Sequence, residues 1–307
     1  MRLVVGVDAG GTASRAVVAT LAGEVVGRGS AGPGNPCASG RAAITAVVAA
    51  AREALSGLDP AAVVAGVLGL AGASAFDDPA YREAFGQAWA EAGLSCPYTV
   101  VGDAVTAFAA GTRAPSGAVL IAGTGAVAAS IHNHHPVRVS DGLGWLLGDD
   151  GSGHWLGLRA LRAAVRSWPS PFATAVAGAV GVPGRDEMIR WAQELPHARI
   201  AGLAPLVCAQ ARAGDPHAAA IVAEAVRLLT ATVDDLGPPQ GPVVLAGSLL
   251  THDTPVRDGL SAVLAGRGVS ALTSGDPAAA AAWLAARPVL GVDAAAAHAA
   301  LALQHHH

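Results

Sequence analysis

The chain has 307 residues, of which 52% are hydrophobic and 14% charged, and its formal net charge is −4. This mildly acidic balance gives no electrostatic reason to expect nucleic acid or an anionic membrane as a partner, and no apolar stretch reaches the roughly 20 residues of a membrane-spanning helix. The length suits two lobes, because domains typically contain about 100–200 residues. We therefore expect small-molecule partners.

The cysteines Cys37, Cys96 and Cys208 are scattered, with no CxxC pair. Their spacing predicts neither a disulfide framework nor a zinc or iron–sulfur site, and it fits a reducing cytoplasm. The N-terminus leads directly into an apolar run that reaches Asp8, so we expect no export signal and a cytoplasmic protein. Residues 305–307 are histidines and are interpreted as the remnant of an expression tag.

The stretch VDAGGTASR, near the N-terminus, places an acid after an apolar run and before a Gly-Gly turn. The apolar segments on either side predict a β-hairpin. The turn at Gly10, Gly11 and Thr12 offers backbone N–H groups. Thr12 and Ser14 add hydroxyls and Asp8 a carboxylate, and together these groups suit a phosphate and its metal ion. A Gly-Gly turn is also ordinary hairpin chemistry, so the motif alone leaves both interpretations open.

The rest of the first half alternates between strand and helix patterns. Short runs rich in Val and Leu predict strands, and segments with apolar residues at helical spacing predict helices. In chain order we expect a strand at 23–32, a helix at 38–58, a strand at 63–72, a helix at 78–94, a strand at 98–103 and a helix at 104–111. This alternation predicts an α/β sheet with helices packed on its faces.

At residue 117 the opening pattern begins again. GAVLIAGTGAVAASI repeats the form strand, turn, strand, with the turn at Gly123, Thr124 and Gly125, and a third strand follows at 136–142. Beyond residue 150 the sequence is largely helical, returns to strands at 242–250 and 268–274, and ends in alanine-rich helices. Two similar lobes, each with a phosphate-binding hairpin tip, are expected to face each other across a cleft and grip a polyphosphate.

Six motifs occur in a fixed order: VDAGGTASR, LAG at 70–72, VGDAVTAFAAG, IAGTGA, DGLGWLLGDDGSGHWLGLRA and LAGS at 245–248. In this order the chain resembles, over nearly its whole length, the N-acetylglucosamine kinase and glucosamine kinase branch of the BadF/BadG/BcrA/BcrD ATPase family, within the superfamily of acetate and sugar kinases, Hsp70 and actin. The resemblance implies an α/β, two-lobed actin-like ATPase fold of duplicated ribonuclease H-like domains with an interlobe cleft. We expect residues 1–112 on the sugar and phosphate side and 113–304 on the nucleotide side, with the last helix packing back on the first lobe.

The same resemblance implies transfer of the γ-phosphate of ATP, with Mg²⁺, to the 6-hydroxyl of N-acetylglucosamine or glucosamine. Asp103 matches the catalytic base, and Asp8 matches the acid that holds the metal ion. The positions that match phosphate or adenosine contacts are Gly10, Gly11 and Thr12 in the first loop, Gly123, Thr124 and Gly125 in the second, and Gly247 and Ser248 in LAGS. The positions that match contacts to the sugar are Asn35, Gly72, Asp103 and Asp149.

The acids also fit this chemistry on their own. Phosphoryl transfer mainly requires positioning and charge neutralisation. An aspartate with a pKa of about 3.9 is ionised at neutral pH and can accept a hydroxyl proton, although Asp103 can also be a helix N-cap. Of the two acids before the next helix, Asp149 is expected to touch ligand and Asp150 to cap the helix or interact with its dipole. On sequence alone, Asn35 is a turn residue.

Some positions depart from the family pattern. Ala126 replaces the serine that usually ends the second phosphate motif, and Pro36, Cys37 and Leu143 differ around the expected sugar site. The choice among N-acetylglucosamine, glucosamine and another hexose therefore stays open, and a homodimer is expected only by analogy. An ATPase that couples hydrolysis to a protein partner and a non-catalytic sugar or nucleotide sensor remain alternatives. The run His132–His135 has the composition of a metal site, but its place between two strands favours a polar turn.

Overall fold

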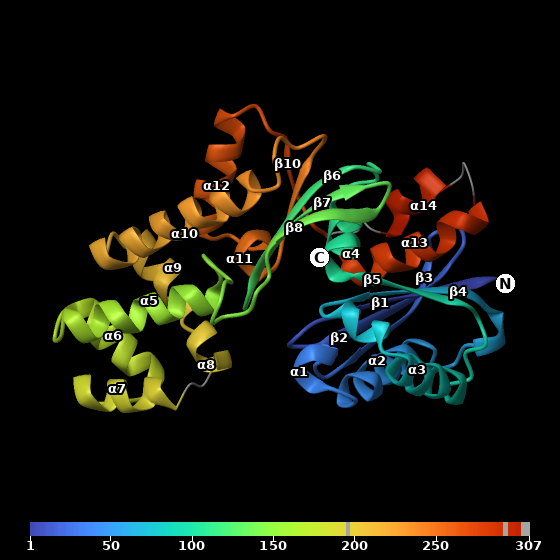
Figure 1. Cartoon of the computed structure of the whole chain (residues 1–307), viewed down its shortest axis with the longest axis horizontal. Helices are drawn as coiled ribbons and strands as arrows, with labels where there is room; N and C mark the ends of the chain where they lie inside the picture. Colours follow the sequence, from blue (N-terminus) through green and yellow to red (C-terminus); the bar gives the residue numbers. More distant parts are fainter. Residues whose placement is uncertain (195–196, 291–293, 302–307) are drawn as a thin grey trace. The chain divides into compact units, whose positions relative to one another are not determined.

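Two five-stranded sheets organise the computed structural model (Figure 1). The structure describes residues 1–194, 197–290 and 294–301. The chain divides into two units: the first comprises residues 1–115, 133–136 and the described residues from 274 onward, and the second comprises 116–132 and the described residues of 137–273. The expected tag remnant, residues 305–307, lies outside the described residues.

The sheet of the first unit is built from β1 (Leu3–Ala9), β2 (Ser14–Thr20), β3 (Val25–Ala31), β4 (Val63–Leu70) and β5 (Tyr98–Gly102). Its strand order is β3-β2-β1-β4-β5. The pairs β1–β2 and β2–β3 are antiparallel, whereas β1–β4 and β4–β5 are parallel. Valine-rich runs form the central strands because β-branched side chains pack well on a pleated, buried surface.

The helices of the first unit are α1 (Pro36–Ser39), α2 (Ala42–Ala54), α3 (Pro79–Glu91), α4 (Asp103–Gly111), α13 (Pro277–Leu290) and α14 (Ala294–Leu301), with short 3₁₀ turns at Pro60–Ala62 and Ala73–Asp77. They cover both faces of the sheet (Figure 1). Along β1, Val5 packs with α2 and α3, while Val4 packs with α4 and α13, because successive strand side chains point to opposite faces. At Gly6 a Cβ would lie only 2.1 Å from the backbone N of Ala282, so glycine and alanine let α13 approach closely.

The second sheet repeats this topology with β6 (Gly117–Ala122), β7 (Ala126–His132), β8 (His135–Asp141), β9 (Val243–Ala246) and β10 (Ala271–Thr273). Its order, β8-β7-β6-β9-β10, matches the first sheet strand for strand. As in the first sheet, the central hairpin β6–β7 is antiparallel, and the β6–β9 and β9–β10 pairs are parallel.

The helices of the second unit are α5 (Gly153–Arg166), α6 (Pro171–Val180), α7 (Arg185–Gln193), α8 (His197–Ala201), α9 (Ala204–Arg212), α10 (Pro216–Asp234), α11 (Ser248–Thr251) and α12 (Pro255–Gly266). Their buried side chains form one core with the sheet, in which Leu120 of β6 packs among residues such as Leu156 and Phe172. Among the described residues, no helix is long and apolar enough to cross a membrane.

The predicted α/β class is confirmed, and each strand expected from the sequence has a counterpart in one of the two sheets. The segment 242–250, expected to be one strand, is strand only over Val243–Ala246. Gly247 then adopts a φ of +82°, which ends the strand, and α11 begins at Ser248. Helices α6, α8, α9, α11 and α12 have no individually predicted counterpart. In α12 the buried Val256, Leu260 and Leu264 do recur at helical spacing, so this helix could have been predicted from its sequence.

The run His132–His135 forms the tight turn between β7 and β8. Asn133 and His134 have φ values of 49° and 60°, the left-handed pair that this kind of hairpin turn requires. The turn is not simply polar, because His134 is only 6% exposed and its ring lies edge-on to Trp283, at 5.4 Å between centroids. Within the described ranges, no group of three or more His, Cys, Asp or Glu side chains is arranged to hold a metal ion.

Candidate active site

Two aspartates meet at the carboxyl ends of parallel strands in the first unit. Asp8 lies near the end of β1, and Asp103 follows β5 as the first residue of α4. Thr106 lies against both: its Oγ1 is 3.3 Å from Asp8 Oδ1 and 3.0 Å from the carbonyl O of Asp103. Gly102 occupies the N-cap position of α4, so the alternative that Asp103 caps this helix is wrong. Asp103 instead lies in the first turn, at the sheet edge where α/β proteins usually bind ligands.

The surroundings of these two acids favour their protonated forms. Burial and the neighbouring Asp103 raise the pKa of Asp8 to about 7, although Thr106 and Arg15 act in the opposite direction. Burial also raises the pKa of Asp103, while backbone N–H groups, including that of Ala104, partly lower it. A cation beside the pair would favour ionisation, and carboxylate oxygens are the ligands that Mg²⁺ prefers. Asp8 therefore fits the expected metal-binding role.

The loop between β1 and β2 leaves space around its glycines. The Gly10 N–H donates to the carbonyl O of Ala13 at 3.0 Å, and a Cβ at Gly10 or Gly11 would meet no atom within 4 Å. Thr12 is exposed at the tip of this loop. Ser14 is different, because it is buried and its hydroxyl donates to the carbonyl O of Gly32 at 3.0 Å. The expectation that the Ser14 hydroxyl is offered to a phosphate is therefore wrong.

Two of the residues expected to contact sugar, Asn35 and Gly72, lie together beside this loop. At Gly72, whose φ is +80°, a Cβ would lie 2.7 Å from Asn35 Oδ1 and 2.9 Å from Cys37 Sγ. Asn35 caps α1, and its Oδ1 accepts the N–H of Cys37 at 2.9 Å, so its side-chain NH₂ group is the part suited to a ligand. The neighbouring Gly34 donates its N–H to the carbonyl O of Gly10 at 3.0 Å, which places Asn35 next to the first phosphate loop.

The second phosphate loop, Gly123–Gly125, is held by backbone hydrogen bonds to the start of α5. Gly153 N–H donates to the carbonyl O of Gly123 at 2.7 Å, and His154 N–H donates to that of Thr124 at 3.1 Å. Across the loop, Gly123 N–H donates to the carbonyl O of Gly125 at 2.9 Å. The start of α5 therefore holds this loop through two hydrogen bonds, whereas the first loop receives one such bond, from Gly34 before α1.

Asp149 lies directly against the second phosphate loop. Its Oδ1 accepts the N–H of Ala126 at 2.9 Å, and a Cβ at Gly125 would lie 2.7 Å from the same oxygen. Burial raises the pKa of Asp149, the N–H of Ala126 partly lowers it, and the charges of Asp141 and Asp150 raise it further. The expected cap of α5 is wrong: Ser152, not Asp150, is the N-cap, and its hydroxyl accepts the N–H of Trp155 at 3.2 Å.

A cavity of about 730 Å³ opens beside this loop within the second unit. Gly123, Thr124 and Ser248 contribute to its lining, and its size suits a small ligand such as a nucleoside. Gly247 fixes the adjacent turn, because with its φ of +82° a Cβ would lie 2.3 Å from the carbonyl O of Ala122. Small residues of α8, α9 and the turn between them supply much of the remaining lining: Ala198, Ala201, Gly202, Ala204, Pro205, Cys208 and Ala209.

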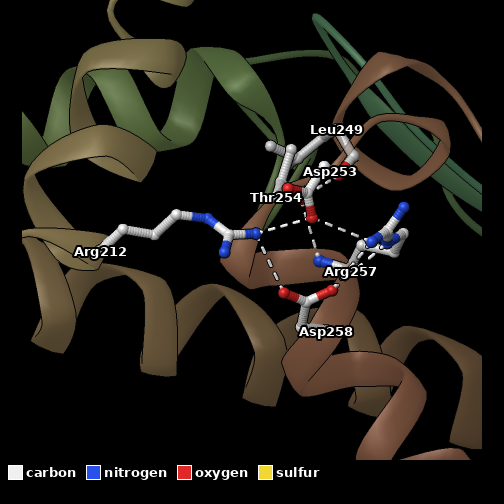
Figure 2. Close-up of polar contacts among 6 residues, drawn as sticks. All are labelled: Arg212, Leu249, Asp253, Thr254, Arg257 and Asp258. Carbon is white, nitrogen blue, oxygen red and sulfur yellow. Dashed lines mark hydrogen bonds and ion pairs between the residues drawn. The ribbon is translucent and has the colours of Figure 1, made fainter.

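The wall of this cavity also carries an ion-pair network (Figure 2). Arg212 reaches from the end of α9 to Asp253 Oδ1 at 2.8 Å and to Asp258 Oδ2 at 3.0 Å, and Asp253 also pairs with Arg257 at 3.0 Å. Thr254 caps α12 and donates its hydroxyl to the carbonyl O of Leu249 at 2.6 Å. The network ties α9 to α12 and leaves a guanidinium group at the cavity.

Three residues near the site have no role in the sequence prediction. Thr106 follows Asp103 by one helical turn, a spacing that could have indicated their contact. Asp141 and Arg212 make their contacts across longer sequence separations, for which the motifs give no signal. The predicted residues form one set in the first unit, around Asp8, and another in the second unit, around the Gly123–Gly125 loop.

Comparisons with known proteins match this arrangement to one family. Residues 5–278 match the model of the BadF/BadG/BcrA/BcrD ATPase family. The chain is 29% identical over 171 residues to an N-acetylmuramic acid/N-acetylglucosamine kinase of Clostridium acetobutylicum, and the match spans 55% of each chain, about half the length of that relative. It is 27% identical over 252 residues to an N-acetyl-D-glucosamine kinase of Dictyostelium discoideum, over 74% of this chain and 76% of that one.

A solved structure supports the same assignment. The fold resembles the crystal structure of a candidate N-acetylglucosamine kinase from Chromobacterium violaceum, with a TM-score of 0.75 and 28% identity, over 92% of this chain and 99% of that chain. The expected fold class is thus confirmed by its duplicated sheets and by this similarity. Since the family model covers most of the sequence, the chain belongs to the BadF/BadG/BcrA/BcrD ATPase family.

Proposed function

We propose that this protein is an ATP-dependent amino-sugar kinase that transfers the γ-phosphoryl group of ATP to the 6-hydroxyl of N-acetylglucosamine or glucosamine. The observation that carries the proposal is the placement of Asp8 and Asp103 at the carboxyl ends of β1 and β5, close enough that the charge of Asp103 raises the pKa of Asp8. The Thr106 hydroxyl contacts the Asp8 carboxylate and the main-chain carbonyl O of Asp103. The names of both curated relatives and of the solved structure support amino-sugar kinase activity.

Asp103 is proposed to accept the proton of the attacking hydroxyl. Burial raises its pKa, which makes the ionised carboxylate a stronger base than an exposed aspartate. Asp8 would hold Mg²⁺, which when bound neutralises charge on the transferring phosphates. Gly10, Gly11 and Thr12 are proposed to line the site of the terminal phosphates, because a Cβ at Gly10 or Gly11 would meet no atom within 4 Å. The N–H groups of Gly11 and Thr12 suit phosphate oxygens, whereas that of Gly10 donates to the carbonyl O of Ala13.

The nucleotide is proposed to occupy the cavity of the second unit. The backbone N–H groups of Thr124 and Gly125 suit its phosphates, with Gly123 beside them in the cavity lining, and Gly247 and Ser248 suit contacts to the adenosine. On the sugar side, the amide of Asn35, the backbone at Gly72 and the carboxylate of Asp149 offer donors and acceptors that can read hydroxyl groups.

These assignments also divide the chain into a part that binds sugar and phosphate and a part that binds the nucleotide. We propose that residues 1–112 carry the sugar and phosphate side and residues 113–304 the nucleotide side, with the end of the chain packing back on the first lobe. The place of α13 and α14 in the first unit supports the last part of this proposal. A homodimer is proposed by analogy, and light scattering on the purified protein tests it.

The function is tested by measuring ADP release with Mg²⁺ and ATP in the presence of N-acetylglucosamine, glucosamine, N-acetylmannosamine, glucose or no sugar. We expect strong stimulation by one of the first two sugars, and ³¹P and ¹H NMR of the product should place the phosphate on O6. Equal ADP release in every tube would contradict the kinase proposal and favour an ATPase. Ligand-induced stabilisation without any ADP release would instead favour a sensor.

A further inference from the structure

Asp141 ends β8 and closes the loop that runs from it to Asp149. Its Oδ1 accepts the N–H of Asp149 at 2.7 Å, and its Oδ2 accepts the N–H of Asp150 at 2.9 Å. One carboxylate therefore accepts hydrogen bonds from two successive backbone N–H groups, which lie eight and nine residues further along the chain. Such charge-assisted hydrogen bonds are stronger than neutral ones, so this side chain fixes where the loop ends.

The backbone around these contacts is strained, and glycine makes the approach possible. Asp141 and Asp149 have φ values of 61° and 57°, a left-handed conformation that aspartate adopts only at a cost. At Gly148 a Cβ would lie 2.1 Å from Asp141 Oδ1. Any other residue at position 148 would collide with the carboxylate that holds the loop.

The conformation held in this way directs Asp149 toward the second phosphate loop. The Asp149 carboxylate lies against Gly125 and accepts the N–H of Ala126, whereas the Asp141 carboxylate accepts backbone N–H groups of its own segment, those of Leu143, Asp149 and Asp150. The Asp141 side chain therefore reaches the loop through Asp149, although the backbone N–H of Gly142 also donates to the carbonyl O of Ala126 at 3.0 Å. The other bonds of the loop, from Gly153 and His154, do not involve Asp141.

We propose that Asp141 is a positioning residue for the phosphoryl-transfer site: it holds Asp149 in the left-handed conformation that places its carboxylate against the second phosphate loop. The inference rests on the proposed function for the consequence in activity, but not for the geometry. Loss of Asp141 is expected to weaken acceptor binding more than ATP binding, because the nucleotide cavity keeps its own lining.

The first test is residue-resolved amide hydrogen exchange in the full chain. In Asp141→Ala, the amides of Asp149 and Asp150 should exchange faster, and so should that of Ala126, by about 100-fold, since exchange tracks the free energy of local opening. The amides of Gly153 and His154 should keep their protection. Unchanged exchange at Ala126 would overturn the proposal, because Asp149 would then hold its place without Asp141.

The second test is kinetic and uses two substitutions that each disturb the hydrogen bonds from Asp141 to the loop. Asp141→Ala and Gly148→Ala should each raise the KM for the amino sugar about tenfold or more and lower kcat, with the KM for ATP within about threefold of wild type. The matched control is Asp186→Asn, an exposed acid of α7, which should match wild type. Asp141→Asn, which keeps one acceptor oxygen, should be intermediate and covers the case in which the alanine variant does not fold.

A double mutant decides whether Asp141 acts through Asp149. Adding Asp141→Ala to Asp149→Asn should cost little beyond Asp149→Asn alone, because coupled residues are not additive. Fully additive losses would overturn the positioning role. If wild type phosphorylates no amino sugar but Ala126 loses protection in Asp141→Ala, the positioning geometry is supported and the proposed function is the part that fails.

Discussion

The two phosphate loops occupy the same place in two sheets of the same topology, yet their neighbours differ. The first loop follows β1, where Asp8 lies one residue before the strand's end, and a Cβ at Gly10 or Gly11 would meet nothing within 4 Å. The second follows β6, where Ile121 stands at the corresponding position, and Gly125 is packed against Asp149. The first loop thus combines an acidic strand end with an open tip, and the second is braced from outside the sheet.

Under the proposed function, this contrast would give the two copies of one topology different tasks. In the first sheet, β5 leads directly into Asp103, so two acids gather at the open loop. In the second sheet the strands bring no such acid pair, and the carboxylate near the loop comes instead from the segment before α5. We infer that phosphoryl transfer takes place beside the first loop and that the second loop holds phosphate in a fixed position.

The largest effect is expected for Asp103→Asn. Asparagine keeps the size of the side chain but cannot accept the hydroxyl proton, so turnover should fall about 10²–10⁴-fold. The measurement is sugar-stimulated ADP release, with circular dichroism to confirm the fold. Full turnover in a folded Asp103→Asn protein would remove Asp103 from the mechanism.

Asp8→Asn should lose most activity and yet stabilise the protein at about pH 8. The pKa of Asp8 is raised to about 7 from its ordinary value of 3.8, so the folded state binds a proton that the unfolded chain lacks between these values. The free energy of unfolding therefore falls as pH rises through this interval. Asparagine avoids that cost, and Tm should rise by about 2–4 °C per kcal/mol gained.

The pH dependence distinguishes this gain from an ordinary packing effect. The stabilisation by Asp8→Asn should shrink as pH falls toward 4, where Asp8 is protonated in the folded protein. Asp77→Asn, at an exposed position, is the matched control and should show no such trend. A gain that is constant with pH would contradict the account of the buried acid pair.

The contrast in loop packing predicts unequal responses to alanine. Gly125→Ala places a Cβ 2.7 Å from Asp149 Oδ1 and should lower the free energy of unfolding by about 1–3 kcal/mol. Gly11→Ala fills open space and should stay within about 0.5 kcal/mol of wild type. Urea denaturation of both variants measures this, and equal losses would show that the two loops are packed alike.

The smallest effect is expected at the cavity wall. Arg212→Ala removes a guanidinium group that pairs with Asp253 and Asp258, and partly exposed pairs of this kind contribute about 0–1 kcal/mol. We expect the KM for ATP to rise by about threefold with little change in Tm. Arg227→Ala, which breaks an exposed pair with Glu224 on α10, is the control and should leave the KM for ATP unchanged.

Much of the framework follows from local sequence patterns. The strands around Asp8 and around Gly123–Gly125 are marked by apolar runs with glycine turns, and both hairpins form as expected. Asp103 is placed at the junction of strand and helix by the pattern VVGDAVTAF alone. Period and turn chemistry are local properties, so one sequence suffices to detect them.

The remaining features depend on contacts that local patterns do not encode. Asp and Ser are both good N-caps, so sequence could not rank Asp150 against Ser152 as the cap of α5. Ser14 looks like a loop hydroxyl, but strand pairing buries it against Gly32. Asp141 reaches a backbone eight residues away because Asp141, Gly142, Gly144 and Asp149 all have positive φ and turn the chain. The glycines mark a turn in the sequence, but they do not show which backbone donors the Asp141 carboxylate meets.

The ratio of sugar phosphate to ADP shows directly whether a sugar hydroxyl receives the phosphoryl group. ADP and sugar phosphate should be measured together in one reaction with Mg²⁺, ATP and N-acetylglucosamine or glucosamine. We expect one molecule of sugar 6-phosphate for each ADP with one of these sugars, and negligible ADP when the sugar is omitted. ADP formed without an equal amount of sugar phosphate would show that water is the acceptor and would contradict the kinase assignment.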